Sequence, residues 1–368
     1  MIETAALISG AVFLILHIIF LIGYLRSSKL EQISGRILPS VSIIVAARNE
    51  EKVIRSCIES LKKIKYTGSE LEIILVNDQS TDLTRELMLK ETSSDTRFKV
   101  IDTGTSSESG LKGKPRAIDI AIRQAKGELI LMTDADCTVH ENWAEETVKY
   151  YTQKTGMVCG FTKIAYEHSL FAKVQAIDWI YLQAIATCSS GINLHTSCIG
   201  NNLSVRKDTY LLLGGYNKIK FSVTEDLALM RRIHKGKLFD VKYPVNPFCL
   251  VTTQECKNLK ELYNQKKRWF RGGIGINFLG YILGTELYIV NLIFLTGFLY
   301  LSPAIYLISV LLKIIAELLI IIPVCIKFRY SRLMEYYILF EIYFALYGLL
   351  LPFTFLTGKN INWKGRKH

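Results

Sequence analysis

Two aspartates separated by a single residue, Asp134 and Asp136, directly follow the short hydrophobic run 128–132. A run of this kind predicts a buried strand, so both carboxylates are expected at the carboxyl end of that strand. Carboxylate oxygens are the usual ligands of hard divalent cations such as Mg²⁺ and Mn²⁺, which proteins often share with substrate phosphates. The pair therefore predicts a cation site that receives a phosphate-bearing substrate.

Strands and helices that alternate along the chain are expected to position these aspartates. Four hydrophobic, partly β-branched runs predict strands: 41–47, 71–76, 99–101 and 128–132. The segments between them have helical spacing, and this alternation implies an α/β protein with a Rossmann-like, mostly parallel sheet. Ligands bind beyond the carboxyl ends of the strands in such sheets. Asp78 follows the second run and is expected at that edge, where it can accept a hydrogen bond from a ribose hydroxyl or a base N–H.

Three further segments carry groups that suit phosphate binding and proton transfer. Lys114 is expected at a helix N-terminus, where the helix dipole favours phosphate. Glu225 and Asp226 precede apolar residues at helical spacing, and a carboxylate there can act as general base for an attacking hydroxyl. The segment 265–269, Gln-Lys-Lys-Arg-Trp, adds cations for phosphate and an aromatic face for a sugar ring.

The hydrophobic residues, half of the 368, are spread unevenly along the chain. The nearly uncharged run 5–25 is long enough to cross a bilayer and has no basic residue before it, so it is expected to be an anchor rather than a cleaved signal peptide. Three further hydrophobic segments are expected at 286–303, 304–325 and 336–357. The basic residues that follow the first run indicate a cytoplasmic middle domain.

These observations predict a multi-pass protein of the cell membrane whose catalytic domain faces the cytoplasm. The expected parts are a transmembrane anchor at 1–35, a cytoplasmic domain at 36–260, an interfacial amphipathic segment at 261–285, about three membrane segments within 286–357 and a basic tail at 358–368. Three later spans would put the tail outside, whereas its basic residues favour the cytoplasm. One of the later segments is therefore expected to be re-entrant or interfacial.

The net charge and the cysteine spacing limit the classes of binding partner and of metal site that the sequence predicts. A net charge of +12 fits contact with anionic lipid head groups and with a nucleotide diphosphate. The sequence has no basic helix or aromatic platform that would indicate nucleic acid, so no nucleic-acid partner is expected. The eight cysteines lack the paired spacing of zinc sites and are expected to be free thiols in a cytoplasmic domain.

The order of the motifs resembles the D, DxD, ED, QxxRW signature of membrane-bound family 2 glycosyltransferases. The resemblance covers about residues 38–272 and consists of Asp78, Asp134 with Asp136, Glu225 with Asp226, and Gln265 with Arg268 and Trp269. Three more segments are similar to the family pattern: 39–50, which ends in Asn49-Glu50; Gly113-Lys114 followed by Ala117; and Gly200-Asn201-Asn202.

The resemblance implies a GT-A fold, the nucleotide-diphospho-sugar transferase fold, with transmembrane helices added. It implies that Asp226 is the catalytic base and that Mg²⁺ or Mn²⁺ binds Asp134 and Asp136. The residues implied in binding the donor nucleotide are Glu50, Asp78, Lys114, Asp134 and Asp136. Those implied near the acceptor or the donor diphosphate are Glu225, Gln265, Arg268, Trp269 and Asn201.

The resulting expectation is an inverting enzyme that moves a sugar from a nucleotide-diphosphate donor, a UDP-sugar, to a membrane lipid by single displacement. A processive polysaccharide synthase is the alternative acceptor class, although such enzymes usually have more spanning helices and a Cys-Gly-Thr-type motif, where this chain has 195–200 instead. A catalytically silent, sugar-nucleotide-binding scaffold would not need Asp226 together with both aspartates of the pair. A nucleotidyltransferase would not need Gln265, Arg268 and Trp269 beside membrane helices.

Overall fold

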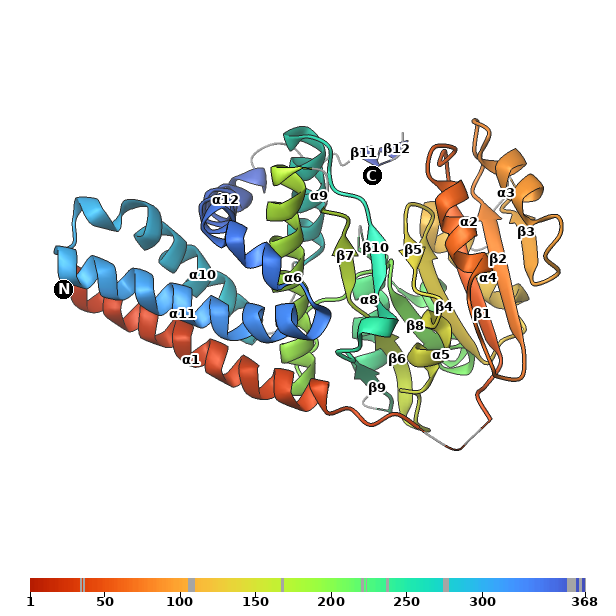
Figure 1. Ribbon diagram of the computed structural model, residues 1–368, viewed down its shortest axis with the longest axis horizontal. Helices are drawn as coiled ribbons and strands as arrows, with labels where there is room; N and C mark the ends of the chain where they lie inside the picture. Colours follow the sequence, from red (N-terminus) through yellow and green to blue (C-terminus); the bar gives the residue numbers. More distant parts are fainter. Residues whose placement is uncertain are drawn as a thin grey trace.

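An α/β domain lies beside a bundle of long helices (Figure 1). The computed structural model describes residues 1–33, 35, 37–104, 110–166, 169–219, 222, 224–235, 238–273, 278–355, 362–363 and 366–367. Most of the basic tail expected at 358–368 lies outside the described residues.

The α/β domain is built on a seven-stranded sheet of order β3-β2-β1-β4-β8-β6-β9. The strands are β1 (Val41–Ala47), β2 (Leu71–Asn77), β3 (Phe98–Asp102), β4 (Leu129–Asp134), β6 (Thr155–Cys159), β8 (Leu203–Arg206) and β9 (Asp240–Lys242). The four predicted strands are parallel to one another, and β8 then pairs antiparallel with both β4 and β6. The mostly parallel α/β sheet is therefore confirmed, with a short antiparallel part that the sequence does not predict.

Helices cover both faces of this sheet, which explains why its strands are continuously hydrophobic. α4 (Gly113–Gln124) and α8 (Glu225–Lys235) pack on one face, around buried side chains such as Ile44 of β1. α2 (Ile54–Lys62), α3 (Thr84–Thr92) and α5 (Trp143–Val148) pack on the other face, around Ile43 and Val45 of the same strand.

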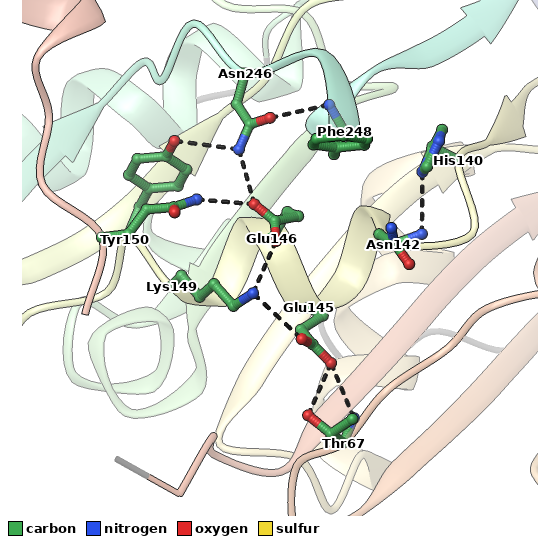
Figure 2. A network of polar contacts seen from close by, with 10 residues as sticks. Thr67, His140, Asn142, Glu145, Glu146, Lys149, Tyr150, Asn246 and Phe248 are labelled. Atoms are coloured by element: carbon green, nitrogen blue, oxygen red, sulfur yellow. Dashed lines mark hydrogen bonds and ion pairs between the residues drawn. The ribbon is translucent and has the colours of Figure 1, made fainter. Parts of the chain in front are cut away.

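A polar network joins α5 to three neighbouring segments (Figure 2). The Glu146 carboxylate accepts hydrogen bonds from Lys149, from the Asn246 side chain at 3.0 Å and from Gln32 at 2.8 Å. Glu145 accepts from the amide and the hydroxyl of Thr67. Gln32 lies in the segment that leaves the first long helix, so this network attaches that segment to the α/β domain.

A second, smaller sheet and several short helices complete the part of the protein outside the long helices. A second sheet of order β5-β10-β7 consists of β5 (Thr138–Val139), β10 (Val251–Thr253) and β7 (Thr162–Ile164). The others are α7 (Lys207–Leu212), α9 (Leu259–Gly272), the 3₁₀ helices η1 (Gly215–Lys218), η2 (Pro247–Cys249), η3 (Gly297–Leu299), η4 (Ser331–Tyr336) and η5 (Leu351–Phe355), and the strands β11 (Asn362–Trp363) and β12 (Arg366–Lys367).

The helical bundle contains α1 (Ile2–Ser28), α10 (Phe278–Thr296), α11 (Pro303–Phe328) and α12 (Tyr337–Leu350). Within the described residues, four stretches are long and apolar enough to cross a membrane: Ile2–Ser28, Gly280–Leu299, Pro303–Phe328 and Ser331–Thr354. α10 begins inside the stretch 261–285 that the sequence assigns to the membrane surface. That stretch is therefore divided between α9 and the start of a membrane-compatible helix.

A long helix from the middle of the chain, α6 (Leu170–Gly191), connects the bundle to the α/β domain, and the sequence does not predict it. α1 crosses α6 in backbone contact, because a Cβ added to Gly23 or to Gly191 would overlap the backbone of the other helix. His17 of α1 shares a hydrogen bond of 2.9 Å with the Tyr181 hydroxyl, and Ser27 donates to the Thr187 carbonyl at 3.1 Å. The first helix is thus packed tightly against α6.

Charged side chains are also buried inside the bundle. Lys313 of α11 lies between Glu317 of the same helix and Glu341 of α12, and all three are at most 1% exposed. The Tyr337 hydroxyl donates a further hydrogen bond of 3.2 Å to Glu317. Because burying unpaired charge is costly, this cluster holds α11 and α12 in register.

Candidate active site

The parallel strands bring the predicted donor residues to one edge of the sheet. The register pairs Ala46 of β1 with Asp134 of β4, and Ala47 with Asn77 of β2. β4 therefore ends one residue before the level at which β2 ends, and Asp78 is the first residue beyond β2. This register places Asp78 and Asp134 at the same edge of the sheet, as the sequence predicts.

Asp78 is held rigidly in the loop after β2. Its side chain is 4% exposed, and Oδ1 accepts a hydrogen bond of 3.3 Å from the Thr103 hydroxyl. Arg48 donates to the Asp78 carbonyl at 2.9 Å, and Arg116 donates to the Thr103 carbonyl at 2.6 Å. The two arginines fix the loops around a buried carboxylate, a setting suited to recognising a single ligand N–H or hydroxyl.

Lys114 joins two of the predicted acidic motifs. It lies in the first turn of α4, and its Nζ is 2.5 Å from Asp134 Oδ1 and 3.5 Å from Glu225 Oε1. Burial alone would lower the pKa of Lys114, but the charges of Asp134 and Glu225 outweigh burial and hold it above its ordinary value. The Lys114 ammonium group therefore lies between the end of β4 and the start of α8.

The two carboxylates at the end of β4, those of Asp134 and Asp136, are suited to bind a divalent cation. Burial raises the pKa of Asp136, and the adjacent charge of Asp134 raises it further. Two carboxylates that repel each other are stabilised when a hard cation binds between them. The described residues hold no group of three His, Cys, Asp or Glu side chains arranged for a metal. Asp134 and Asp136 can thus supply two ligands to Mg²⁺ or Mn²⁺.

Asp226 has the environment of a general base. Its Oδ1 accepts the backbone N–H of Leu227 at 2.8 Å, and a Cβ added to Gly200 would lie 3.0 Å from its Oδ2. Burial raises the pKa of Asp226 to about 6 and the Glu225 charge contributes, while the charges of Lys114 and Arg268 act in the opposite direction. A carboxylate with a pKa near 6 is ionised at neutral pH and is still basic enough to accept a proton.

The helix α9 carries Gln265, Arg268 and Trp269 on neighbouring positions of one face. The Asn258 side chain caps it by accepting the Glu261 amide at 2.9 Å. Gln265 Oε1 is buried and has no hydrogen-bond donor among the described residues. A buried acceptor of this kind suits a ligand hydroxyl, since buried polar atoms are rarely left unsatisfied.

The other two predicted residues have well-defined backbone or side-chain contacts. The Glu50 amide donates to the Thr84 hydroxyl at 2.7 Å, which ties the loop after β1 to α3. Asn201 is 5% exposed, and its Oδ1 accepts from the Thr162 hydroxyl of β7 at 2.7 Å. This bond anchors the segment that contacts Asp226 through Gly200. A direct contact of Glu50 or Asn201 with substrate stays a prediction.

Two features of the site escape sequence reasoning. Asp178 of α6 is fully buried and forms an ion pair with Lys266 of α9. Gly272 of α9 packs so closely on Thr224 that an added Cβ would overlap its side chain. An aspartate between two large hydrophobic residues, Ile177 and Trp179, is a signal that could have pointed to Asp178. Nothing in the sequence pairs Gly272 with Thr224.

Comparisons with known proteins identify the family and the fold. The family model Glycosyl transferase family 2 matches residues 42–209, and Glycosyl transferase family group 2 matches residues 129–356. The chain belongs to the family 2 glycosyltransferases. Among solved structures, the mannosyltransferase PcManGT from Pyrobaculum calidifontis, in complex with GDP-Man and Mn²⁺, has a TM-score of 0.60 at 15% identity. That match covers 96% of this chain and 99% of the other, and it confirms the GT-A fold.

Two characterised kinds of relative have different products. The poly-beta-1,6-N-acetyl-D-glucosamine synthase of Staphylococcus epidermidis is 26% identical over 253 residues, which are 68% of this chain and 57% of the relative. The beta-monoglucosyldiacylglycerol synthase of Nostoc sp. is 29% identical over 241 residues, which are 64% of this chain and 49% of the relative. The matched region is thus about half the length of these relatives.

Proposed function

We propose that the protein transfers a sugar from a nucleotide-diphosphate donor, a UDP-sugar, to the hydroxyl of a membrane lipid, with inversion at the anomeric carbon. The observation that carries this proposal is the position of Lys114, in contact with Asp134 on one side and Glu225 on the other. Lys114 contacts Asp134 of the predicted diphosphate site and also Glu225, the neighbour of the predicted base Asp226, so the two predicted groups lie close together. A transferase that displaces a diphosphate needs both groups at the same sugar carbon.

The donor would bind along the carboxyl edge of the sheet. In this proposal Asp78 binds the nucleoside, and Lys114 and Arg268 face the diphosphate. Mg²⁺ or Mn²⁺ would be held by Asp134 and Asp136 and would neutralise charge on the leaving diphosphate when bound. Lys114 and Arg268 add to that stabilisation because they are fixed before the reaction begins.

Asp226 would take the proton from the acceptor hydroxyl as that oxygen attacks the anomeric carbon. Its pKa of about 6 supports this role. Gln265 Oε1 offers a buried acceptor for a second hydroxyl, and Trp269 offers an aromatic face beside it. A single displacement of this kind gives a product of inverted configuration.

Replacing Asp226 tests the assignment of the base. D226N keeps the shape of the side chain but cannot accept the proton, so transfer should fall by about 10²- to 10⁴-fold, while UDP affinity changes little. D208N is the matched control, because Asp208 lies in the first turn of α7 and is exposed. Normal turnover of D226N, or an equal loss in D208N, would remove Asp226 as the base.

The proposed orientation has α1, α10 and α11 crossing the membrane and the catalytic domain in the cytoplasm. α12 has 14 residues, and the 24-residue stretch Ser331–Thr354 reaches the length of a membrane span only together with the flanking 3₁₀ helices η4 and η5. It starts beside the end of α11, and the chain after it returns to α9, where Arg271 donates to the Thr354 carbonyl at 3.0 Å. These contacts support an interfacial α12 and a cytoplasmic tail.

The choice of acceptor rests on the number of spanning helices. Three or four such helices suit a lipid acceptor lying in the bilayer better than a growing polymer that needs a channel, although the likeness to a poly-N-acetylglucosamine synthase keeps a processive product as the second candidate. The test incubates membranes that contain the protein with labelled UDP-glucose, UDP-N-acetylglucosamine or GDP-mannose. Label in the organic phase supports lipid transfer, and label in water-soluble polymer supports the alternative. Transfer from none of these donors would contradict the proposal.

A further inference from the structure

The face of α9 opposite Arg268 carries a charge that points away from the proposed active site. Lys266 is two residues before Arg268, about 200° around the helix, and is 5% exposed. Its ammonium group forms an ion pair with Asp178 of α6, which is fully buried. A buried pair of opposite charges is held between the helix with the acceptor-side residues and the helix that joins the domain to the bundle.

Aromatic side chains from α9 and α12 contact this ion pair. The Tyr347 hydroxyl of α12 donates to Asp178 Oδ1 at 2.6 Å, and the Tyr343 hydroxyl donates to Oδ2 at 3.3 Å. The Lys266 ammonium lies 4.7 Å from the centroid of the Tyr347 ring and 4.9 Å from that of the Trp269 ring. Both contacts are in the range of favourable cation–π interactions. The pair therefore reaches α12 on one side and Trp269 on the other.

Trp269 is held from a second direction by α6. Its ring meets that of Trp179 edge to face, with centroids 5.2 Å apart and an interplanar angle of 62°. The start of α9 is tied to the same helix, because the Gln175 side chain bonds to both the amide and the carbonyl of Cys256. Rotation of α9 would break all of these contacts together.

We infer that Asp178 and Lys266 are positioning residues, which fix the rotation of α9 so that Gln265, Arg268 and Trp269 face the reacting sugar. This inference rests on the proposed function for the role of those three residues. A pair kept only for stability could be replaced by neutral residues without loss. Positioning requires both charges. The Lys266 ammonium orients the Trp269 ring, and the Asp178 carboxylate accepts hydrogen bonds from the two tyrosine hydroxyls of α12.

The experiment separates stability from position by a double-mutant cycle in the full-length protein. D178N and K266M each leave a buried charge unpaired, so both should unfold at lower temperature than the wild type. The double variant D178N/K266M removes both charges and should regain the wild-type unfolding temperature. Its kcat/KM should stay about 10- to 100-fold low, because a small misplacement of binding groups costs that much. K266R keeps the charge and should stay within a few fold of the wild type.

The control is K313M/E317Q/E341Q, which removes all three charges of the buried cluster of α11 and α12. It should leave kcat/KM unchanged at temperatures where the protein is folded. Full activity of D178N/K266M would overturn the inference, and so would an equal loss in K313M/E317Q/E341Q. The three nucleotide sugars above serve as donors.

A spectroscopic readout keeps the test independent of transfer activity. Two indoles at 5.2 Å couple electronically, so circular dichroism should show a Trp179–Trp269 couplet that W179F removes. D178N/K266M should weaken the couplet, whereas K266R should keep it. If the wild type transferred none of the three sugars, the proposed function would fail, and the couplet would still decide whether the pair orients Trp269. An unchanged couplet in D178N/K266M would overturn the inference.

Discussion

At the scale of single residues, the proposed chemistry depends on unequal environments for neighbouring carboxylates. Glu225 contacts Lys114, whereas Asp226 is half-buried beside Glu225 and accepts one backbone N–H. Burial together with the Glu225 charge raises the pKa of Asp226 to about 6. The two side chains are adjacent in sequence but differ in their contacts, and the raised pKa prepares Asp226 to accept a proton near neutral pH.

This difference predicts an acid limb in the pH profile. In the proposed mechanism transfer requires ionised Asp226, so kcat/KM should be flat well above pH 6 and fall about tenfold per pH unit well below it. Unfolding through this group does not explain such a fall, because a raised pKa means that the folded chain binds the proton more tightly than the unfolded chain does. Initial rates between pH 4.5 and 8 measure the limb. A profile still flat at pH 5 would contradict the prediction.

The site residues that the sequence predicts are those whose position follows from the strand or helix next to them in the chain. Asp134 and Asp136 follow a hydrophobic strand, and Asp226 begins a helix, so position along the chain is enough to find them. The contact of Lys114 with Glu225 joins residues far apart in sequence and follows only from packing. The same is true of Asp178, which is buried in an ion pair only because α9 and α12 pack against α6 at this position.

At the scale of elements, the position of α8 relative to α9 is set by close contact between Gly272 and Thr224. Thr224 directly precedes Glu225, so any shift at this contact moves the start of α8. The parallel strands β1, β2 and β4 were predictable because strands buried on both faces are continuously hydrophobic. β8 and β9 have only four and three residues, too short for a distinct pattern, and β6 begins with Thr155 and Gly156, of which glycine is unfavourable in strands. α6 mixes polar and apolar residues because its polar groups find partners on other helices.

Adding a methyl group at this contact should lower activity. G272A forces α9 away from Thr224, and overpacking of this kind costs about 1–3 kcal/mol, while alanine returns about 0.5–1 kcal/mol of helix stability. We expect kcat/KM to fall roughly 5- to 100-fold with a small change in unfolding temperature. G284A is the control, because an added Cβ there meets no atom of the described residues within 4 Å. Wild-type kinetics for G272A would show that the contact does not position α8.

At the scale of the whole molecule, the two ends of the bundle differ. The N-terminus and the turn between α10 and α11 lie at the end far from the α/β domain, and the carboxyl ends of α1 and α11 lie near it (Figure 1). The Glu3 carboxylate accepts the Ser302 amide at 2.9 Å, which joins α1 to α11 at the far end. The bundle is therefore polarised along its length.

Labelling of single introduced cysteines tests the proposed orientation. Y300C, in the turn between α10 and α11, should react with a membrane-impermeant maleimide in intact cells. R332C, after α11, and F353C, after α12, should react only once the cells are permeabilised. Background labelling is low because seven of the eight native cysteines are buried. Labelling of F353C in intact cells would mean that α12 crosses the membrane.

The glycine crossing of α1 and α6 has a geometric consequence for acceptor choice. Because the backbones touch at Gly23 and Gly191, a shift of the α/β domain relative to α1 would have to disrupt this close contact. If α1 spans the membrane as proposed, the crossing sets one depth at which an acceptor hydroxyl would reach Asp226. Acceptors would then be sorted by how far their hydroxyl stands above the hydrocarbon, before any contact with their sugar or glycerol atoms is made.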